Sequence, residues 1–288
     1  RPRWTIEGLL RTSAEYLSEK GIENPRLNAE LLLSKALNLS RLKLYLDLKR
    51  PLTEQEASDF RILIKRRLKR EPLQYILGTA PFYTVQLKVG PGVLIPRPET
   101  ELLVDTILKE IRSGKFGIGP ILCLDIGTGS GCIAISVLKE SKDTLFVATD
   151  ISDAALSYAR ENASSEGVSD RLDLRQGDLF EPIGRWEHFA IIVSNPPYVR
   201  EDQWEMLQPE IREFEPKVAL TAGPDGLSIV RRIVREGIDY MKEGGLLLLE
   251  IAPSQAKEVS HMMEEAGLKD IRLLKDLSGA HRAVLGYK

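Results

Sequence analysis

Apolar residues recur every three or four positions from residue 5 to residue 77, which is the spacing of a single helix face. Asn24 followed by Pro25 predicts a helix start, and Thr53 with Glu56 three residues later fits a capping box at a second start. Because the apolar faces of short helices must cover one another, the pattern predicts a small bundle of four or five helices. We expect residues 1–77 to form one helical domain.

Glycine and proline change the pattern between residues 78 and 98. Two short β-prone runs, Phe82–Val85 and Val93–Ile95, lie among these breakers. Such a segment predicts a hairpin-like linker and the best domain boundary of the chain. The breakers are Gly78, Pro81, Gly90, Pro91, Gly92, Pro96 and Pro98.

From residue 99 to residue 288, short apolar runs alternate with helical patterns. Alternation of this kind predicts an α/β domain with a mostly parallel, Rossmann-like sheet of seven strands and helices on both faces. The last two runs are close enough in sequence to pair antiparallel at one edge. Helices are expected near residues 99–112, 153–166, 227–241 and 254–266, and strands near 121–125, 145–149, 172–176, 190–194, 246–251, 271–274 and 283–287.

Composition places the chain among ordinary globular proteins. Hydrophobic residues make up 43% and charged residues 28% of 288 residues, with a formal net charge of -2. The only two cysteines, Cys123 and Cys132, sit in apolar runs, which suits a reducing compartment. No apolar stretch approaches the roughly 20 residues that cross a bilayer, and the first residues lack a signal-peptide pattern. We expect a soluble, cytoplasmic protein with no membrane partner.

A glycine-rich turn follows the first strand of the predicted sheet. The run Leu122–Asp125 is apolar and ends in an acid, and the next residues alternate glycine with small residues. Glycine lets the backbone approach a ligand closely at the carboxyl end of a strand. A tight turn without a ligand is the alternative, but three alternating glycines after an acid exceed what a turn requires. We expect a cofactor against Gly127, Thr128, Gly129, Ser130 and Gly131.

The spacing of these glycines separates two classes of cofactor. A dinucleotide fingerprint needs G-x-G-x-x-G/A, whereas this chain has G-x-G-x-G, with Cys132 at the third small-residue position. The Asp125 carboxylate would repel a pyrophosphate and attract an ammonium group. Because S-adenosylmethionine carries an ammonium and a sulfonium, the sequence favours S-adenosylmethionine as the cofactor.

Two further acids follow the second and third predicted strands. Asp150 is placed to accept hydrogen bonds from the two ribose hydroxyls, as an acid at this position does in dinucleotide folds. It could instead cap the helix that begins near Asp153, although Ser152 can do so as well. Asp178 is a candidate acceptor for the adenine amino group, with Leu179 near the ring, but a plain turn aspartate is an equally good interpretation.

The fourth strand leads directly into Asn195-Pro196-Pro197-Tyr198. Two prolines block both helix and ladder, so the chain leaves the sheet as a stiff, extended loop. Its position is the carboxyl edge of the sheet, facing the cofactor turn. An ordinary turn is the alternative, and the location beside a cofactor site argues against it.

The residue types of this tetrapeptide suit transfer of a methyl group to nitrogen. An amide nitrogen is a poor nucleophile because its lone pair is delocalised into the carbonyl group. The Asn195 side-chain oxygen and the Pro196 backbone oxygen can each accept one hydrogen of an NH₂ group, and the Tyr198 ring can stack on the planar group. A sulfonium is already a strong electrophile, so orientation and placed dipoles suffice, without nucleophile, strong base or metal.

The histidines and the basic residues add no second chemistry. His188, His261 and His281 are scattered without metal-ligand spacing, and we expect them at the surface or at sheet edges. The basic stretch at residues 65–70 could contact RNA or an acidic partner, but a solvated helix face is the stronger interpretation. The mild net acidity gives no support for direct binding of nucleic acid.

Taken together, these motifs resemble the HemK/PrmC family, the protein-(glutamine-N5) methyltransferases that modify class 1 peptide chain release factors. The resemblance covers nearly the whole chain. The tetrapeptide alone is shared with adenine-N6 DNA enzymes and ribosomal-RNA guanine-N2 enzymes, whereas the linker motif joined to the helical front domain is more specific. The segments that carry the resemblance are Glu71–Gly78, Leu94–Glu101, Gly127–Gly131, Asn195–Tyr198, Glu213–Pro216 and Pro224–Leu227.

The resemblance implies a class I methyltransferase domain and a glutamine substrate in the Gly-Gly-Gln motif of a release factor. On this basis Gly127–Gly131, Asp150, Leu179 and Asn195 line the cofactor site, and Asn195–Tyr198 hold the glutamine. The helical domain would grip the release factor, and methylation would support translation termination.

Two other functions are left open by the sequence. A nucleic-acid base methyltransferase would need an unstacked base and a basic groove, for which the short front domain and mild acidity give little support. A non-catalytic adaptor with a vestigial cofactor site is disfavoured by the intact glycine turn and tetrapeptide. The sequence does not decide the oligomeric state, the details of partner recognition or the roles of Arg97 and Glu99.

Overall fold

The computed structural model describes residues 4–288, and these residues form two compact units. The helical unit comprises the chain up to Thr79 together with Gln208–Phe214. The sheet unit comprises Ala80–Leu207 and Glu215–Lys288. Within residues 4–288, no helix combines the length and the apolar character that a membrane span requires.

The helical unit confirms the predicted bundle. Its core is a cluster of fully buried aliphatic side chains around Phe60, because each short helix turns one apolar face inward. The short helix α9 joins this unit although it lies more than 130 residues further along the chain. The helices are α1 (Ile6–Glu19), α2 (Pro25–Leu37), α3 (Arg41–Leu46), α4 (Glu54–Leu68), α5 (Leu73–Leu77) and α9 (Pro209–Phe214).

The two predicted helix starts behave differently. Thr53 and Glu56 form the capping box that the spacing predicts, with a hydrogen bond in each direction. Asn24 is the N-cap residue of α2 and Pro25 its first residue, as predicted, but the Asn24 side chain makes no capping hydrogen bond. Asn24 takes a left-handed conformation (φ 49°), which asparagine tolerates better than most residues, and its carbonyl accepts from the Asn28 side chain at 3.1 Å.

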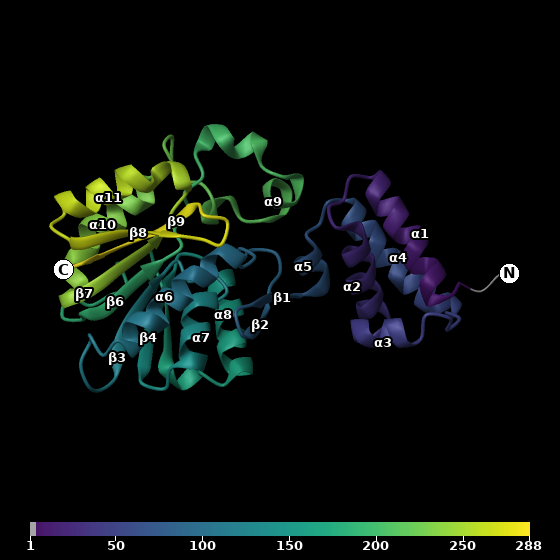
Figure 1. Cartoon of the computed structure of the whole chain (residues 1–288), viewed down its shortest axis with the longest axis horizontal. Helices are drawn as coiled ribbons and strands as arrows, with labels where there is room; N and C mark the ends of the chain where they lie inside the picture. Colours follow the sequence, from purple (N-terminus) through teal and green to yellow (C-terminus); the bar gives the residue numbers. More distant parts are fainter. Residues whose placement is uncertain (1–3) are drawn as a thin grey trace. The chain divides into compact units, whose positions relative to one another are not determined.

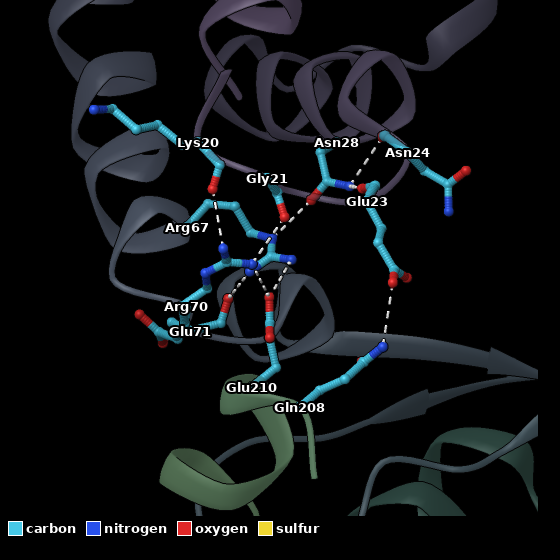
Figure 2. A network of polar contacts seen from close by, with 10 residues as sticks. All are labelled: Lys20, Gly21, Glu23, Asn24, Asn28, Arg67, Arg70, Glu71, Gln208 and Glu210. Carbon is cyan, nitrogen blue, oxygen red and sulfur yellow. Dashed lines mark hydrogen bonds and ion pairs between the residues drawn. The ribbon is translucent and has the colours of Figure 1, made fainter. Parts of the chain in front are cut away.

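Helix α9 is held in the helical unit by an acidic residue that meets two arginines (Figure 2). The Glu210 carboxylate accepts from Arg67 at 2.9 Å and from Arg70 at 3.3 Å. The Gln208 side chain donates to Glu23 at 3.3 Å. These contacts account for the assignment of residues 208–214 to this unit.

Arg67 corrects the expectation of a wholly solvated basic face at residues 65–70. Arg67 is only 6% exposed. Its guanidinium also donates a hydrogen bond to the Asn28 side chain at 2.8 Å. A buried guanidinium needs acceptors, and Glu210 supplies a charged one from a distant part of the sequence. Lys65 and Lys69 on the same stretch are exposed, as predicted.

The sheet unit contains the predicted seven-stranded sheet (Figure 1), in the order β5-β4-β3-β6-β7-β9-β8. All neighbours are parallel except β9, which is antiparallel to β7 and to β8, so the predicted antiparallel edge pair is confirmed. The strands are β3 (Ile121–Ile126), β4 (Thr144–Asp150), β5 (Leu172–Gln176), β6 (Phe189–Ser194), β7 (Met241–Glu250), β8 (Lys269–Lys275) and β9 (His281–Tyr287).

Helices cover both faces of this sheet, so the alternating side chains of its strands enter two separate cores. Helices α6, α7 and α8 pack on one face and α10 and α11 on the other (Figure 1). The helices are α6 (Glu101–Arg112), α7 (Cys132–Glu140), α8 (Asp153–Glu166), α10 (Ser228–Tyr240) and α11 (Ala256–Glu265), with the 3-10 turns η1 (Pro98–Thr100), η2 (Ser169–Arg171), η3 (Glu201–Met206), η4 (Lys217–Ala219) and η5 (Pro253–Gln255).

The strand order places three sequence motifs at one edge of the sheet. β3 lies between β4 and β6, with Ile126 opposite Thr149 on one side and Ser194 on the other. The residues that follow these three positions are therefore neighbours at the carboxyl end of the sheet. This is the switch point where open α/β sheets bind their ligands.

The linker contains a two-stranded sheet whose turn differs from the predicted one. β1 (Thr79–Phe82) pairs with β2 (Val85–Lys88), and Tyr83 at φ 51° makes the turn inside the run that we expected to be a strand. The second predicted run, Val93–Ile95, forms no strand. Pro91-Gly92 precedes it and Pro96 follows it, and the Ile95 amide donates to a side-chain carboxylate at 3.0 Å instead of to a neighbouring strand.

Candidate active site

A cleft of about 1050 Å³ lies at the carboxyl ends of β3, β4, β5 and β6 in the sheet unit. Its walls come from the glycine turn, the ends of three strands, the linker and the segment after α9. The lining residues are Gly92, Val93, Leu94, Pro96, Thr100, Gly127, Thr128, Gly129, Ser130, Cys132, Ile133, Thr149, Asp150, Ile151, Ser152, Ala155, Gly177, Asp178, Leu179, Asn195, Pro197, Pro216, Val218, Ala219 and Ile229.

The glycine turn needs glycine for two separate physical reasons. Gly127 and Gly129 have φ of 68° and 57°, and a Cβ atom at either would meet nothing within 4 Å, because both residues face the open cleft. Gly131 has φ 82°, and a Cβ there would lie 2.7 Å from the Ile135 side chain, so its role is packing of the turn on α7. The bare backbone at Gly127 and Gly129 leaves room for the close approach of a ligand, which fits the expected cofactor.

Asp150 ties the second strand to this turn. Its Oδ2 accepts from the Gly129 amide at 2.8 Å and its Oδ1 from the Ser152 amide at 2.9 Å. Burial raises the pKa of Asp150, although these amide donors oppose the rise. The cap of α8 is Ser152, whose hydroxyl accepts from Ala155 at 3.2 Å, so Asp150 is not needed for capping. Each carboxylate oxygen can accept a further hydrogen bond, as ribose hydroxyls would require.

Asp178 and Leu179 lie on the same cleft wall after β5. The Asp178 carboxylate forms an ion pair with Arg232 at 2.8 Å, so one of its oxygens already has a charged partner. Leu179 takes a left-handed backbone conformation (φ 52°) that is fixed by a hydrogen bond from the Thr149 hydroxyl to its carbonyl at 3.0 Å. The sequence gives no sign of the Arg232 contact, because 54 residues separate the partners.

Asp125 lies beneath the glycine turn and does not line the cleft. It is fully buried, and its Oδ2 accepts from the Thr128 hydroxyl at 2.7 Å. Burial raises its pKa to about 7. Its Oδ1 has no hydrogen-bond partner among residues 4–288. Asp125 thus supports the turn through Thr128, and its attraction for the ligand ammonium stays a prediction.

The tetrapeptide presents Asn195 and Pro197 to the cleft. Pro196 and Tyr198 are absent from its lining, and the Tyr198 hydroxyl donates to Glu250 at 3.2 Å. Burial, together with the nearby Glu250 carboxylate, raises the pKa of the Tyr198 phenol above its usual range. The Tyr198 hydroxyl is thus held inside the protein.

The backbone of the tetrapeptide is braced by the motif at residues 224–227. The Tyr198 carbonyl accepts from the Gln255 side chain at 3.2 Å, and the same Gln255 nitrogen also donates to the Gly226 carbonyl at 3.2 Å. Gly226 has φ 73°, and a Cβ on it would lie 2.3 Å from the Tyr198 carbonyl oxygen. Only glycine fits this close approach, which explains the glycine in Pro224–Leu227.

Two buried residues that the sequence analysis did not single out form a hydrogen-bonded chain that ends on Asn195. The Asn195 Nδ2 donates to the Thr100 hydroxyl at 3.0 Å, and that hydroxyl donates to Glu250 Oε2 at 2.7 Å. Thr100 and Glu250 are each 1% exposed. A carboxylate that ends an apolar strand is the signal that could have found Glu250, since charged groups are rarely buried without a specific partner.

The structure places Arg97 and Glu99 differently. Arg97 donates to the buried carboxylate of Glu215 at 2.5 Å, and the other oxygen of that carboxylate accepts from the Ile95 amide at 3.0 Å. Arg97 therefore braces the linker against the segment that returns to the cleft. Glu99 is exposed on η1.

Two of the three histidines lie at the surface as predicted, since His188 and His261 are exposed. His281 differs: it is half-buried at the start of β9, which lies between β7 and β8 and is not an edge strand. Within the part of the chain that the structure describes, no cluster of three or more histidine, cysteine or acidic side chains could hold a metal ion. Both cysteines are free thiols.

The strand order, the glycine turn and the cleft at the switch point define a class I methyltransferase domain. A solved T. thermophilus 16S rRNA N2 methyltransferase, in complex with AdoMet and guanosine, shares this fold with TM-score 0.53 at 18% identity, over 73% of this chain and 49% of its own. The chain also matches two protein families, the PrmC N-terminal domain over residues 8–78 and the Methyltransferase small domain over residues 98–212.

Curated relatives match at nearly full length. The release factor glutamine methyltransferase of Geobacter sulfurreducens is 43% identical over 98% of this chain and 96% of its own. The protein of the same name from Rhodopirellula baltica is 38% identical over 97% of this chain and 95% of its own. The chain belongs to the release factor glutamine methyltransferase family.

Proposed function

We propose that this enzyme transfers a methyl group from S-adenosylmethionine to the side-chain amide nitrogen (N5) of the glutamine in the Gly-Gly-Gln motif of class 1 peptide chain release factors. The near full-length similarity to release factor glutamine methyltransferases supports the substrate. The observation that carries the chemistry is the position of Asn195 on the cleft, at the strand end beside the glycine turn. The product would support translation termination, a cytoplasmic process, so we place the enzyme in the cytoplasm.

The cofactor would lie against the glycine turn. Gly127, Thr128, Gly129, Ser130 and Gly131 would form its backbone cradle, because the exposed backbone at two of the glycines leaves room for close approach. Asp150 would accept from the ribose hydroxyls, and Asp178 and Leu179 would border the adenine. Asn195 would reach both the cofactor and the substrate. When bound, S-adenosylmethionine supplies a methyl group already activated by its sulfonium.

The protein's contribution is to orient the amide nitrogen. The Asn195 Oδ1 and the Pro196 carbonyl would each accept one hydrogen of the glutamine NH₂ group, which turns the nitrogen lone pair toward the methyl carbon. The nitrogen gains the methyl group and releases one proton to water, so no strong base is needed. Pro197 and Tyr198 would bound the planar amide. Placement of this kind acts through orientation and preorganised dipoles.

We also propose a division of labour along the chain. Residues 1–77 would recognise the release factor, residues 78–98 would link the domains, and residues 99–288 would carry catalysis. The helical unit is matched to the PrmC N-terminal domain, which supports a role separate from the common methyltransferase fold.

The test is a transfer assay with the purified full chain, methyl-labelled S-adenosylmethionine and a class 1 release factor. Mass spectrometry should find one added methyl group on the Gly-Gly-Gln glutamine, and a factor with that glutamine changed to alanine should take up no label. Label on the altered factor would contradict the substrate assignment. Label on DNA or RNA without any protein would favour the base methyltransferase that shares the tetrapeptide.

A further inference from the structure

Thr100 lies between the tetrapeptide and a buried acid. Its hydroxyl oxygen is 3.0 Å from Asn195 Nδ2 and 2.7 Å from Glu250 Oε2. The three residues come from the end of β6, from η1 and from the end of β7. Because Thr100 and Glu250 are each 1% exposed, water does not compete for these hydrogen bonds.

The direction of these hydrogen bonds follows from the donors available. In its ionised form the Glu250 carboxylate only accepts, so the single hydroxyl proton of Thr100 then points to Glu250. The Thr100 oxygen then offers Asn195 a lone pair and no proton. Only the NH₂ end of the Asn195 amide can satisfy it, which leaves the carbonyl Oδ1 as the end that faces away from Thr100.

The Thr100 oxygen thus fixes an orientation of the Asn195 amide that amide geometry alone leaves open. The two ends of an asparagine amide have nearly the same shape, and what distinguishes them is the hydrogen-bond partners. A flipped Asn195 would place two N–H donors against the N–H donors of an incoming amide. Such a site would repel the group that it must orient.

We propose that Thr100, with its proton held by Glu250, is the positioning residue that keeps the Asn195 carbonyl turned toward the acceptor nitrogen. The proposal deepens the proposed function and rests on it for the identity of the acceptor. Glu250 also accepts a hydrogen bond from the Tyr198 hydroxyl at 3.2 Å. One carboxylate therefore orients two side chains of the tetrapeptide, Tyr198 directly and Asn195 through Thr100. Thr100 lies in the segment Leu94–Glu101, which gives this segment a role in the chemistry in addition to its part in the linker.

The variants Thr100→Val and Thr100→Ser separate the hydroxyl from the shape of the side chain. Valine keeps the branched shape and removes the acceptor, so we expect kcat to fall about 10- to 100-fold, in line with the loss of one orienting group. The dissociation constant for S-adenosylmethionine, measured by calorimetry, should stay within about twofold. Serine keeps the hydroxyl and should restore kcat to within about threefold of the parent.

Thr106→Val is the matched control for loss of a buried threonine hydroxyl. Thr106 is 9% exposed, and its hydroxyl donates to the Leu102 carbonyl at 2.7 Å, within the helix that follows Thr100. Its kcat should stay within about twofold of the parent. A Thr100→Val enzyme with parental kcat, or one whose cofactor affinity falls as much as its rate, would overturn the proposal.

A second measurement does not depend on the acceptor. The side-chain NH₂ resonances of Asn195, assigned by their loss in Asn195→Asp, should shift in Thr100→Val and return in Thr100→Ser. If these signals respond to Thr100 while no release factor is methylated, the positioning role stands and the proposed function fails. Signals that do not change in Thr100→Val would refute the hydrogen bond itself.

Discussion

The Glu210 carboxylate lies 2.9 Å from the guanidinium of Arg67, although 143 residues separate the two in the chain (Figure 2). The Arg67 side chain is 8% exposed and that of Glu210 is 15% exposed, so the pair is largely desolvated. The segment that carries Glu210 begins ten residues after the tetrapeptide and thus belongs to the same connection between β6 and α10. A loop of the catalytic sequence is therefore part of the helical unit.

Removal of Glu210 should release this segment. Glu210→Ala leaves the Arg67 charge buried without its carboxylate, which we expect to lower the free energy of unfolding of the helical unit by about 2–4 kcal/mol. Hydrogen exchange at residues 208–214 should increase, and urea denaturation should give the free energy. Glu213→Ala is the control, because Glu213 lies in the same helix and is exposed. Equal exchange in both variants would contradict the anchoring role of Glu210.

A side chain on the glycine turn should block the cofactor. In Gly129→Ala the methyl group projects into the cleft, so we expect calorimetry to show at least a tenfold rise in the dissociation constant for S-adenosylmethionine. The left-handed φ of 57° adds a strain of roughly 1–2 kcal/mol. Gly167→Ala controls for that strain, because Gly167 has φ 70° and open space around it but ends α8 outside the cleft. If both variants bind the cofactor equally well, the cradle is assigned wrongly.

Loss of the Asn195 amide should affect the rate far more than binding of the cofactor. In Asn195→Ala the acceptor nitrogen loses one of its two orienting groups, so we expect kcat to fall at least about 100-fold. The dissociation constant for S-adenosylmethionine should change by less than about threefold, because the glycine turn and Asp150 are unaltered. Parallel turnover and calorimetry measurements test this. Equal losses of rate and affinity would contradict the orienting role.

The sequence was informative wherever a property is local. The strand at residues 172–176 and the helix at residues 153–166 have the predicted bounds, because each is set by periodicity and flanking residues. The glycine turn lies at the carboxyl end of β3, because an acid and alternating glycines follow an apolar run directly. The predicted Rossmann-like sheet is likewise confirmed.

Contacts between distant residues could not be predicted from these patterns. Thr100 meets Glu250 across 150 positions, and Arg67 meets Glu210 across 143. Nothing in the local sequence of one partner specifies the identity of the other. The strand order brings Thr100 and Glu250 together, and the packing of residues 208–214 on the helical unit brings Glu210 to Arg67. The same reason explains why a run of basic residues on α4 was expected to be solvated.

The buried Glu250 should make stability depend on pH in a direction opposite to that of an ordinary ion-paired acid. Burial raises the pKa of Glu250 to about 7 from an ordinary value of 4.5. Hydrogen bonds from Thr100 and Tyr198 and the positive charge of Arg282 oppose this rise, while the charge of Glu99 adds to it. Between pH 4.5 and 7 the folded chain therefore holds a proton that the unfolded chain has lost. Stability falls as pH rises through this window.

Glu250→Gln keeps the shape of the side chain and removes this titration. We expect the variant to match the parent in stability near pH 4.5 and to exceed it by up to about 3 kcal/mol at pH 8, since each pKa unit corresponds to about 1.36 kcal/mol. Urea denaturation at several pH values measures the difference. Glu243→Gln, which alters an exposed acid on the same strand, should show no such trend. A variant that is less stable than the parent at pH 8, or a difference that is constant with pH, would mean that Glu250 is held as a favourable charge in the folded protein.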